Sequence, residues 1–348
     1  MDGTNQTGDS GGLVVGVDAG GTATRCLVAT VDGTVLARGL AGGANQNSSA
    51  GRPADALGAA LRSALSHVDT SRIEIGVIGA AGSGGAGRAA ARDAAQAAWR
   101  SVGLPGEVVP VTDLEVAFAA GTPHRSGFLL LAGTGAAAVA FGDGVLRRRC
   151  DGYGWLLGDV GSAVWIGLEG LRRVLEAIDG RAAPTALTGP ITALAAGPEG
   201  FDDRETHAQA LLAWAFARPP AALGQLAPLV NDAAAAGDAA ALAIVSAAST
   251  GLLHALDTVA EGADGPVVLA GSVLLSPGPV AGRVRAGVRA RFGVDAVAAH
   301  DGAAGAANMA IARLTGAPVS ADVHMRLTSG HAGSAPPVEP AGQVTAWQ

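Results

Sequence analysis

The same arrangement of short segments occurs twice in this chain, about 115 residues apart, and it constrains the fold more than any other feature. Each copy has an apolar strand, a turn containing Gly and Thr, a second strand, an Asp-Gly turn and a third strand. The copies begin at residues 13 and 128, and their Gly-Thr turns are 18–22 and 132–135. Asp-Gly is a typical hairpin turn, so each copy is predicted to be a three-stranded meander. A doubled meander, followed each time by helical sequence, predicts two similar α/β domains facing each other across a cleft.

The remaining sequence is arranged around these two units. Predicted helices are 53–68, 88–102 and 301–314, predicted strands are 73–79, 108–111 and 267–270, and the Ala/Leu-rich stretch 164–260 is predicted to be a helical insertion in the second domain. The expected units are a flexible N-terminus (1–11), an N-terminal α/β domain (12–122) on which a helix 301–316 packs back, a C-terminal α/β domain (123–300) and a loosely packed tail (317–348).

The charged residues exclude several classes of protein. All 23 basic side chains are Arg, so neither a P-loop lysine nor a Schiff-base lysine is present. The net charge is −7 with no basic stripe, which argues against nucleic acid as a partner. The only basic run, Arg147-Arg148-Arg149, is interpreted as a solvated strand end. The uncharged stretch 126–142 is too weakly apolar to span a bilayer, and the N-terminus lacks a signal pattern, so we expect a cytoplasmic protein without a membrane partner.

The first Gly-Thr turn is Asp18-Ala19-Gly20-Gly21-Thr22. Adjacent glycines after a buried strand let backbone N–H groups approach an anion closely, the Thr hydroxyl adds a donor, and the Asp can hold Mg²⁺. Taken alone, the motif also fits an ordinary hairpin turn. The second turn, Gly133-Thr134-Gly135, occupies the same place in the second copy. Two anion-binding turns across a cleft are what is needed to hold the phosphates of a nucleotide.

Asp113 follows the strand that ends the first domain. Thr112 and Glu115 have the spacing of a capping box, so Glu115 is interpreted as a structural residue at a helix start. An ionised carboxylate at that position is also what phosphoryl transfer requires of a base that accepts the proton of an attacking hydroxyl.

Residues 151–162 combine four glycines with Tyr153, Trp155 and Asp159. Aromatic rings beside exposed backbone and a carboxylate form a typical sugar-binding surface. The alternative is a structural glycine-rich turn before a helix that Ser162 caps. Gly271-Ser272, after a buried strand, could support an adenosine, although such a pair is common in ordinary turns.

Together these segments resemble the N-acetylglucosamine kinase and glucosamine kinase branch of the BadF/BadG/BcrA/BcrD ATPase family, over roughly residues 14–314. The most specific match is Gly152-Tyr153-Gly154-Trp155-Leu156-Leu157-Gly158-Asp159, which is similar to a Gly-Trp-Gly-x-x-x-Gly-Asp-Glu-Gly-Ser signature. The resemblance implies two ribonuclease-H-like domains of the actin/hexokinase-like superfamily, ATP and Mg²⁺ as cofactors, and a homodimer.

The resemblance also implies roles for matching residues. Asp113 would be the catalytic base for a sugar 6-hydroxyl, and Asp18 would hold the metal. The residues implied to bind the sugar are Asn45, Asp113, Gly152, Tyr153 and Asp159. The residues implied to bind the nucleotide are Gly20, Gly21, Thr22, Gly133, Thr134, Gly135, Gly271 and Ser272.

Three departures from the family pattern bear on the substrate. The usual Glu after Asp159 is Val160, the usual aromatic is Tyr153 rather than Trp, and the second phosphate motif continues with three alanines. We therefore expect free glucosamine as substrate, with N-acetylglucosamine as the alternative. The free ammonium group of glucosamine requires a carboxylate within hydrogen-bond distance, and the candidates are Asp151, Asp159 and Glu115.

Two functions of other classes have the same fold. An ATPase activator of this family would carry an iron–sulfur cluster on bridging cysteines, but Cys26 and Cys150 are far apart and fall on predicted strands. A sugar sensor would keep the fold and lose the base, whereas this chain has both Asp18 and Asp113.

Overall fold

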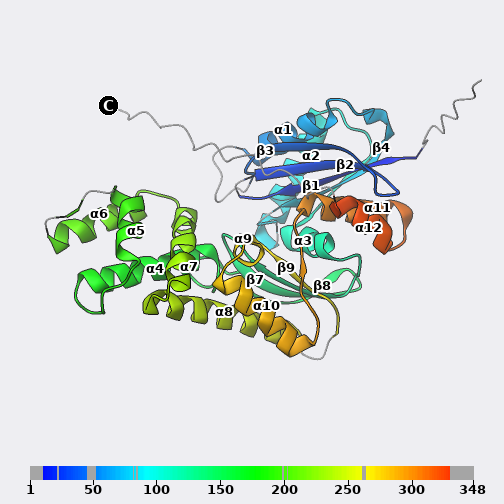
Figure 1. The fold of residues 1–348 in the computed structure, drawn as a ribbon. Helices are drawn as coiled ribbons and strands as arrows, with labels where there is room; N and C mark the ends of the chain where they lie inside the picture. The colour runs from blue at the N-terminus through cyan, green and yellow to red at the C-terminus, as the bar shows by residue number, and fades with distance from the viewer. Residues whose placement is uncertain are drawn as a thin grey trace, which may run out of the picture.

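The computed structural model describes residues 11–21, 23–44, 52–80, 82–83, 85–197, 200–201, 203–260 and 264–329. It contains two halves, each with one five-stranded sheet, and this confirms the predicted class of two α/β domains (Figure 1). The second half carries a block of helices that extends away from both sheets.

The first sheet has the order β3-β2-β1-β4-β5. β1 (Leu13–Ala19), β2 (Ala23–Thr30) and β3 (Val35–Gly42) form the predicted antiparallel meander, while β4 (Ile73–Ala80) and β5 (Glu107–Thr112) run parallel to β1. The second sheet, β10-β9-β6-β7-β8, repeats this plan. Its meander is β6 (Gly127–Ala132), β7 (Ala136–Gly142) and β8 (Val145–Asp151), with β9 (Val267–Ala270) parallel to β6 and a short β10 (Val297–Ala298) beyond it.

Helices cover both faces of the first sheet. α1 (Pro53–Leu65) and α2 (Arg88–Ser101) pack on the face that carries Val15 and Val17. α11 (Gly302–Thr315) packs on the opposite face, and it approaches so closely that a Cβ on Gly16 would meet the backbone of Ala303 and Ala307. Because residues alternate between the faces of a strand and helices cover both faces here, β1 is apolar from Leu13 to Val17. The glycine at position 16 is what permits the contact with α11.

α3 (Asp113–Gly121) joins the two halves. It follows β5 directly and packs against α11 as well as β6 and β9 of the second sheet. Figure 1 shows α3 and α11 between the two sheets. Asn308 on α11 donates a side-chain hydrogen bond to the carbonyl of Ala119 on α3, at 3.0 Å. The apolar face of α3, with Leu114 and Phe118, is buried against the second sheet, so the position of α3 depends on both halves.

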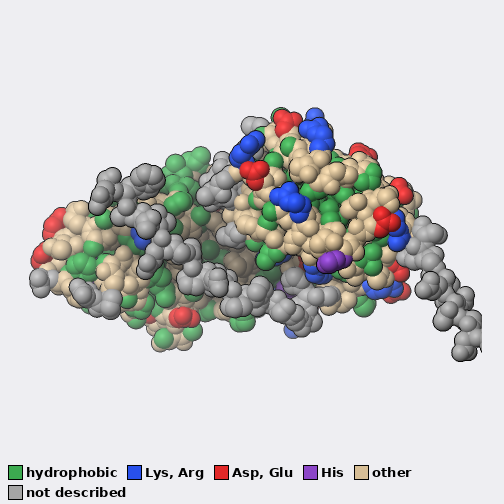
Figure 2. Space-filling view, turned by 90° about the horizontal axis from the view of Figure 1, so that it is seen from above, with side chains coloured by type: hydrophobic (Ala, Val, Ile, Leu, Met, Phe, Trp, Pro, Cys, Tyr) green, Lys and Arg blue, Asp and Glu red, His purple; other side chains and the backbone are tan. Residues whose placement is uncertain are grey.

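The helical insertion consists of α4 (Ala163–Ile178), α5 (Thr188–Ala196), α6 (Arg204–Phe216), α7 (Ala227–Ala235) and α8 (Ala239–Ala260). Ser162 caps α4 as predicted, accepting a hydrogen bond from the N–H of Trp165. Seen from above, the helical block shows few charged side chains, whereas the first half carries most of those in view (Figure 2). Among the described residues, only α8 has the length and apolar composition of a membrane span; it packs instead on β6, β7 and β8.

The second half is completed by α9 (Ser272–Leu275) and α10 (Pro279–Phe292), and short 3-10 turns occur at Thr70–Arg72, Gly85–Gly87 and Pro220–Leu226.

The prediction of a loosely packed tail from residue 317 is wrong for its first part. α12 (Ala321–Thr328) is capped by Ser320, buries Leu327 completely, and its His324 Nε2 lies 3.0 Å from the carbonyl oxygen of Ala119. The Gly, Pro, Ser and Ala content of residues 317–348 hides this short amphipathic helix, because composition averages over a segment whose apolar positions are only three or four residues apart.

Candidate active site at the junction of the two halves

Asp18 and Asp113 lie at one edge of the first sheet. Asp18 is near the carboxyl end of β1, and Asp113 begins α3 directly after β5. The parallel register pairs Ala80 of β4 with both Ala19 and Thr112, so the two aspartates are held at the same ends of β1 and β5, the strands on either side of β4. Ligands of open α/β sheets bind at these ends.

The predicted capping box fixes the start of α3. The N–H of Thr112 donates to Glu115 Oε2 at 2.8 Å, and the N–H of Glu115 donates to Thr112 Oγ1 at 3.2 Å. The hydroxyl of Thr112 also donates to Glu115 Oε2, at 2.8 Å. Glu115 is therefore a structural residue, as predicted. Asp113, the other acid in this first helical turn, takes no part in the capping box.

Asp18 lies against the start of α11, where a Cβ on Gly302 would collide with its carboxylate. Burial raises the pKa of Asp18 from 3.8 to about 6; Arg25 lowers it, and the charges of Asp113 and Asp301 raise it. Asp301 is itself buried and pairs with Arg38 of β3. Asp18 is thus a carboxylate whose ionised form is poorly compensated by the protein, so a bound cation would stabilise it.

Burial also raises the pKa of Asp113. The N–H groups of Leu114 and of Asp113 itself lower it, followed by the charge of Arg149 on β8, while Glu115 raises it. Arg149 belongs to the second half, so Asp113 lies within electrostatic reach of both halves.

The second Gly-Thr turn has well-defined neighbours. The N–H of Gly133 donates to the carbonyl of Gly135 at 2.9 Å, and the carbonyl of Gly133 accepts from the N–H of Ala163 at 2.8 Å. Gly271, with a φ of 88°, packs against Ala132 and Gly133 so closely that a Cβ would overlap their backbone. Thr134 and Ser272 are exposed. The structure therefore brings the predicted second phosphate turn and the predicted adenosine turn together.

Asp159 lies beside the same turn. A Cβ on Gly135 would stand 2.8 Å from Asp159 Oδ2, and Asp159 Oδ1 accepts a hydrogen bond from the N–H of Gly154 at 3.2 Å. Burial raises the pKa of Asp159, while the N–H groups of Gly154 and Ala136, and the charge of Arg149, lower it. The charge of Arg149 thus acts on both Asp113 and Asp159.

The loop between β8 and α4 presents apolar side chains to solvent. Tyr153, Leu156 and Leu157 are 69%, 74% and 80% exposed, and Trp155 is 42% exposed. The N–H of Gly152 donates to Asp151 Oδ1 at 2.7 Å. Arg149 holds the same part of the loop by donating from Nε to the carbonyl of Asp151 at 2.9 Å and from Nη2 to that of Gly152.

Not every predicted site residue can be placed, because Thr22 and Asn45 lie outside the described residues. Gly20 donates its N–H to the carbonyl of Ala23 at 3.0 Å, which is the expected turn. Sequence reasoning missed Arg149, which it interpreted as part of a solvated basic run, and it missed Gly302. A glycine directly after Asp301 at a helix start was a signal for close approach.

The described residues include no group of three His, Cys, Asp or Glu side chains that could hold a metal ion. Asp18 alone suits Mg²⁺, which usually keeps several water ligands and binds one or two carboxylates together with substrate phosphates. Cys26 is buried in β2, which raises the pKa of its thiol to about 12, and Cys150 lies on β8 in the other sheet. The two cysteines are core and strand residues of different halves.

Comparison with known proteins gives consistent matches. Residues 15–310 match the model of the BadF/BadG/BcrA/BcrD ATPase family. The chain is 30% identical over 179 residues to an N-acetylmuramic acid/N-acetylglucosamine kinase of Clostridium acetobutylicum, which covers 51% of this chain and 58% of that protein. It is 30% identical over 151 residues to an N-acetyl-D-glucosamine kinase of Dictyostelium discoideum, covering 42% and 45%. The chain thus matches about half the length of these curated relatives.

Similarity of structure extends further. A crystal structure of a candidate N-acetylglucosamine kinase from Chromobacterium violaceum superposes with a TM-score of 0.70 at 26% identity. The superposition covers 87% of this chain and 99% of that one. Both halves and their arrangement are therefore shared with that protein.

Proposed function

This chain belongs to the BadF/BadG/BcrA/BcrD ATPase family, and we propose that it is an ATP-dependent kinase that phosphorylates the 6-hydroxyl of N-acetylglucosamine. The observation that carries the proposal is the position of Arg149, whose charge acts on Asp113 of the first half and on Asp159 of the second. The proposed base and the proposed sugar-binding carboxylate thus lie within range of one charge, and Asp159 adjoins the Gly133-Thr134-Gly135 turn.

In this mechanism Asp113 accepts the proton of the attacking sugar hydroxyl. Its position at the first turn of α3 favours the ionised form, because the helix N-terminus stabilises negative charge. The two Gly-Thr turns are assigned to the phosphates of ATP, with the exposed Thr134 as one donor, and Gly271 and Ser272 are assigned to its adenosine. Asp18 would hold Mg²⁺, which when bound neutralises charge on the transferred phosphoryl group.

Asp159 and the exposed rings of Tyr153 and Trp155 are assigned to the sugar. The apolar faces of these rings suit the C–H face of a pyranose. Closure of the two halves would exclude water, which competes with the sugar as phosphoryl acceptor.

The acetylated sugar is preferred over free glucosamine, reversing the expectation from the sequence. The positive charge of Arg149 opposes an ammonium group at this junction. Asp151 and Glu115, two of the three carboxylates considered as ammonium partners, are occupied by backbone N–H groups. Both curated relatives are named for N-acetylated sugars.

The test is a coupled ADP-release assay with the purified chain, ATP and Mg²⁺ over a panel of N-acetylglucosamine, N-acetylmuramic acid, glucosamine, N-acetylmannosamine and glucose. We expect the highest kcat/KM with N-acetylglucosamine and a 6-phosphate product, identified by NMR. Higher kcat/KM with glucosamine would restore the alternative substrate, and no sugar-dependent ADP release would contradict the kinase proposal. We also expect a cytoplasmic homodimer, which light scattering and cell fractionation would test.

A further inference from the structure

Two cavities lie next to each other beside α3, and neither is lined by Asp18, Asp113 or Asp159. The first, of about 310 Å³, lies between the start of α2, the end of β5 and the start of α3. The second, of about 330 Å³, lies between α3, the β7–β8 hairpin and the C-terminal part of α11. Glu115 and Arg313 line both, so the two cavities form one groove that continues along α3.

The groove is rich in positive charge. Arg88 lines its first part, Arg125 its second part, and Arg313 stands where the parts meet. Within the described part of the chain, no carboxylate lies within ion-pair distance of these three arginines. The single acid in the wall is Glu115, whose carboxylate accepts two hydrogen bonds from Thr112 and whose backbone N–H donates to the Thr112 hydroxyl oxygen. In a chain of net charge −7, three arginines that lack carboxylate partners around one groove are a site for an anion.

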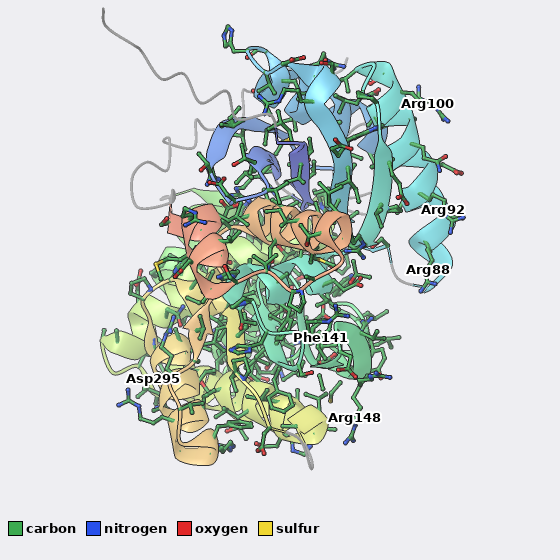
Figure 3. All side chains as sticks on the ribbon, turned by 90° about the vertical axis from the view of Figure 1, so that its right-hand side faces the viewer. Arg88, Arg92, Arg100, Phe141, Arg148 and Asp295 are labelled. Atoms are coloured by element: carbon green, nitrogen blue, oxygen red, sulfur yellow. The ribbon has the colours of Figure 1, made fainter. Side chains whose placement is uncertain are left out.

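The second part of the groove also has an apolar wall. Phe118 and Phe141 stack there with ring centroids 4.5 Å apart and planes 21° apart, and Met309 and Val319 lie beside them. Figure 3 shows Arg88 at the end of α2 nearest the second half, with Phe141 in the second half below it. Arg88 and Arg313 thus come from α2 and α11, which pack on the first sheet, whereas the aromatic wall is shared between Phe118 of α3 and Phe141 of the second sheet.

We propose that this groove binds a small organic phosphate, with the phosphate between Arg88 and Arg313 and an apolar part against Phe118, Phe141 and Met309. A phosphate dianion compensates two arginine charges, and arginine pairs with phosphate in a bidentate geometry. The site is separate from the proposed sugar and nucleotide sites, and it does not depend on the chain being a kinase.

The test is isothermal titration calorimetry of the full chain with phenyl phosphate as the probe, in the presence of saturating AMPPNP and Mg²⁺. We expect binding with one site per chain that AMPPNP does not displace. Inorganic phosphate lacks the apolar ring and phenol lacks the phosphate group, so each should bind at least about tenfold more weakly than phenyl phosphate.

Arg313→Ala should weaken phenyl phosphate binding by at least about tenfold, because one charge-assisted contact is lost. Arg88→Ala provides a second variant at an exposed position, and it should weaken binding to a similar extent. Arg100→Ala is the matched control, since Arg100 is an exposed arginine of the same helix, α2, that lines neither cavity.

Absence of phenyl phosphate binding, equal binding by the parent, Arg88→Ala and Arg313→Ala chains, or displacement by AMPPNP would each overturn the proposal. Sugar-dependent ADP release is measured separately, so failure of the kinase proposal and failure of this one are distinguishable.

Discussion

The carboxylate of Asp151 accepts a hydrogen bond from the backbone N–H of Asp159, at 2.7 Å, across eight residues of glycine-rich loop. The same carboxylate accepts from the N–H groups of Gly152 at 2.7 Å and Val160 at 3.0 Å. Asp151 adopts a φ of 65°, a left-handed conformation that Asp tolerates better than most residues. This one side chain therefore closes the loop that carries Tyr153 and Trp155 and positions Asp159 at its end.

Replacement of Asp151 should destabilise the protein and lower its activity. Asp151→Ala leaves three backbone donors without their acceptor and should reduce the free energy of unfolding by about 2–4 kcal/mol. Asp143→Ala is the control, because Asp143 also has a positive φ, of 56°, but its side chain makes only an exposed ion pair of 3.6 Å with Arg147. Chemical denaturation would compare the two, and equal losses would show that backbone strain, rather than the hydrogen bonds, sets the cost.

Removal of the proposed base should lower turnover without unfolding the chain. Asp113→Asn keeps the shape of the side chain but cannot accept the sugar proton, so kcat should fall by at least about a hundredfold. Asp55→Asn is a matched control, since Asp55 is also an acid in the first turn of a helix, α1. Steady-state kinetics with N-acetylglucosamine measure the effect. A near-normal kcat in Asp113→Asn would remove Asp113 from the mechanism.

The pH dependence of the reaction should report on Asp113 and Arg149. Because burial raises the pKa of Asp113 and a base works only when ionised, kcat/KM should fall as pH decreases through a value above the ordinary Asp pKa of about 4. Arg149 lowers this pKa, so Arg149→Met should move the acidic limb to higher pH, whereas Arg149→Lys, which keeps the charge, should leave it nearly in place. An acidic limb that is the same in both variants would mean that Arg149 does not act on the base.

Much of the fold is predictable because its signals are local. The Asp-Gly turns of both meanders, the capping box of Thr112 and the N-cap of Ser162 are each specified within a few residues, and all are confirmed. The ion pair between Arg38 and Asp301 joins residues 263 positions apart and leaves no local pattern. Asp151 is a candidate for substrate binding on sequence alone, because the sequence does not show that its carboxylate accepts hydrogen bonds from the backbone N–H groups of its own loop. Arg149 was assigned to solvent, because a basic run does not reveal which of its members faces the other half.

The contact between Gly302 and Asp18 predicts a second effect on activity. Gly302→Ala places a Cβ against the Asp18 carboxylate, so this group must shift, and kcat/KM should fall by roughly tenfold. Gly282→Ala is the control, because a Cβ there meets nothing within 4 Å, and alanine in α10 should raise the free energy of unfolding by about 0.5–1 kcal/mol. Kinetics and thermal unfolding on both variants separate the two effects. Unchanged kcat/KM in Gly302→Ala would show that the position of Asp18 is not critical.

The ionised carboxylate of Asp18 should lower the stability of the folded chain. Its pKa rises from 3.8 to about 6 on folding, so the folded state binds the proton more tightly than the unfolded state. Ionisation of Asp18 therefore destabilises the fold, and this loss develops as pH rises from about 4 to about 6 and is complete above that. A shift of about two pKa units corresponds to at most about 3 kcal/mol, and because Asp18 keeps some solvent exposure we expect roughly half of this.

Asp18→Asn should consequently unfold at a higher temperature than the parent chain at pH 7, and it should lose Mg²⁺-dependent activity. Near pH 3.5 the two chains should unfold at similar temperatures, because Asp18 is then mainly protonated in both the folded and the unfolded parent chain. Differential scanning calorimetry without Mg²⁺ at several pH values measures the difference. Asp55→Asn provides the reference for an exposed acid, which should change little across the same range. If Asp18→Asn were less stable than the parent chain at pH 7, the carboxylate would be a structural acceptor rather than a group held ready for a cation.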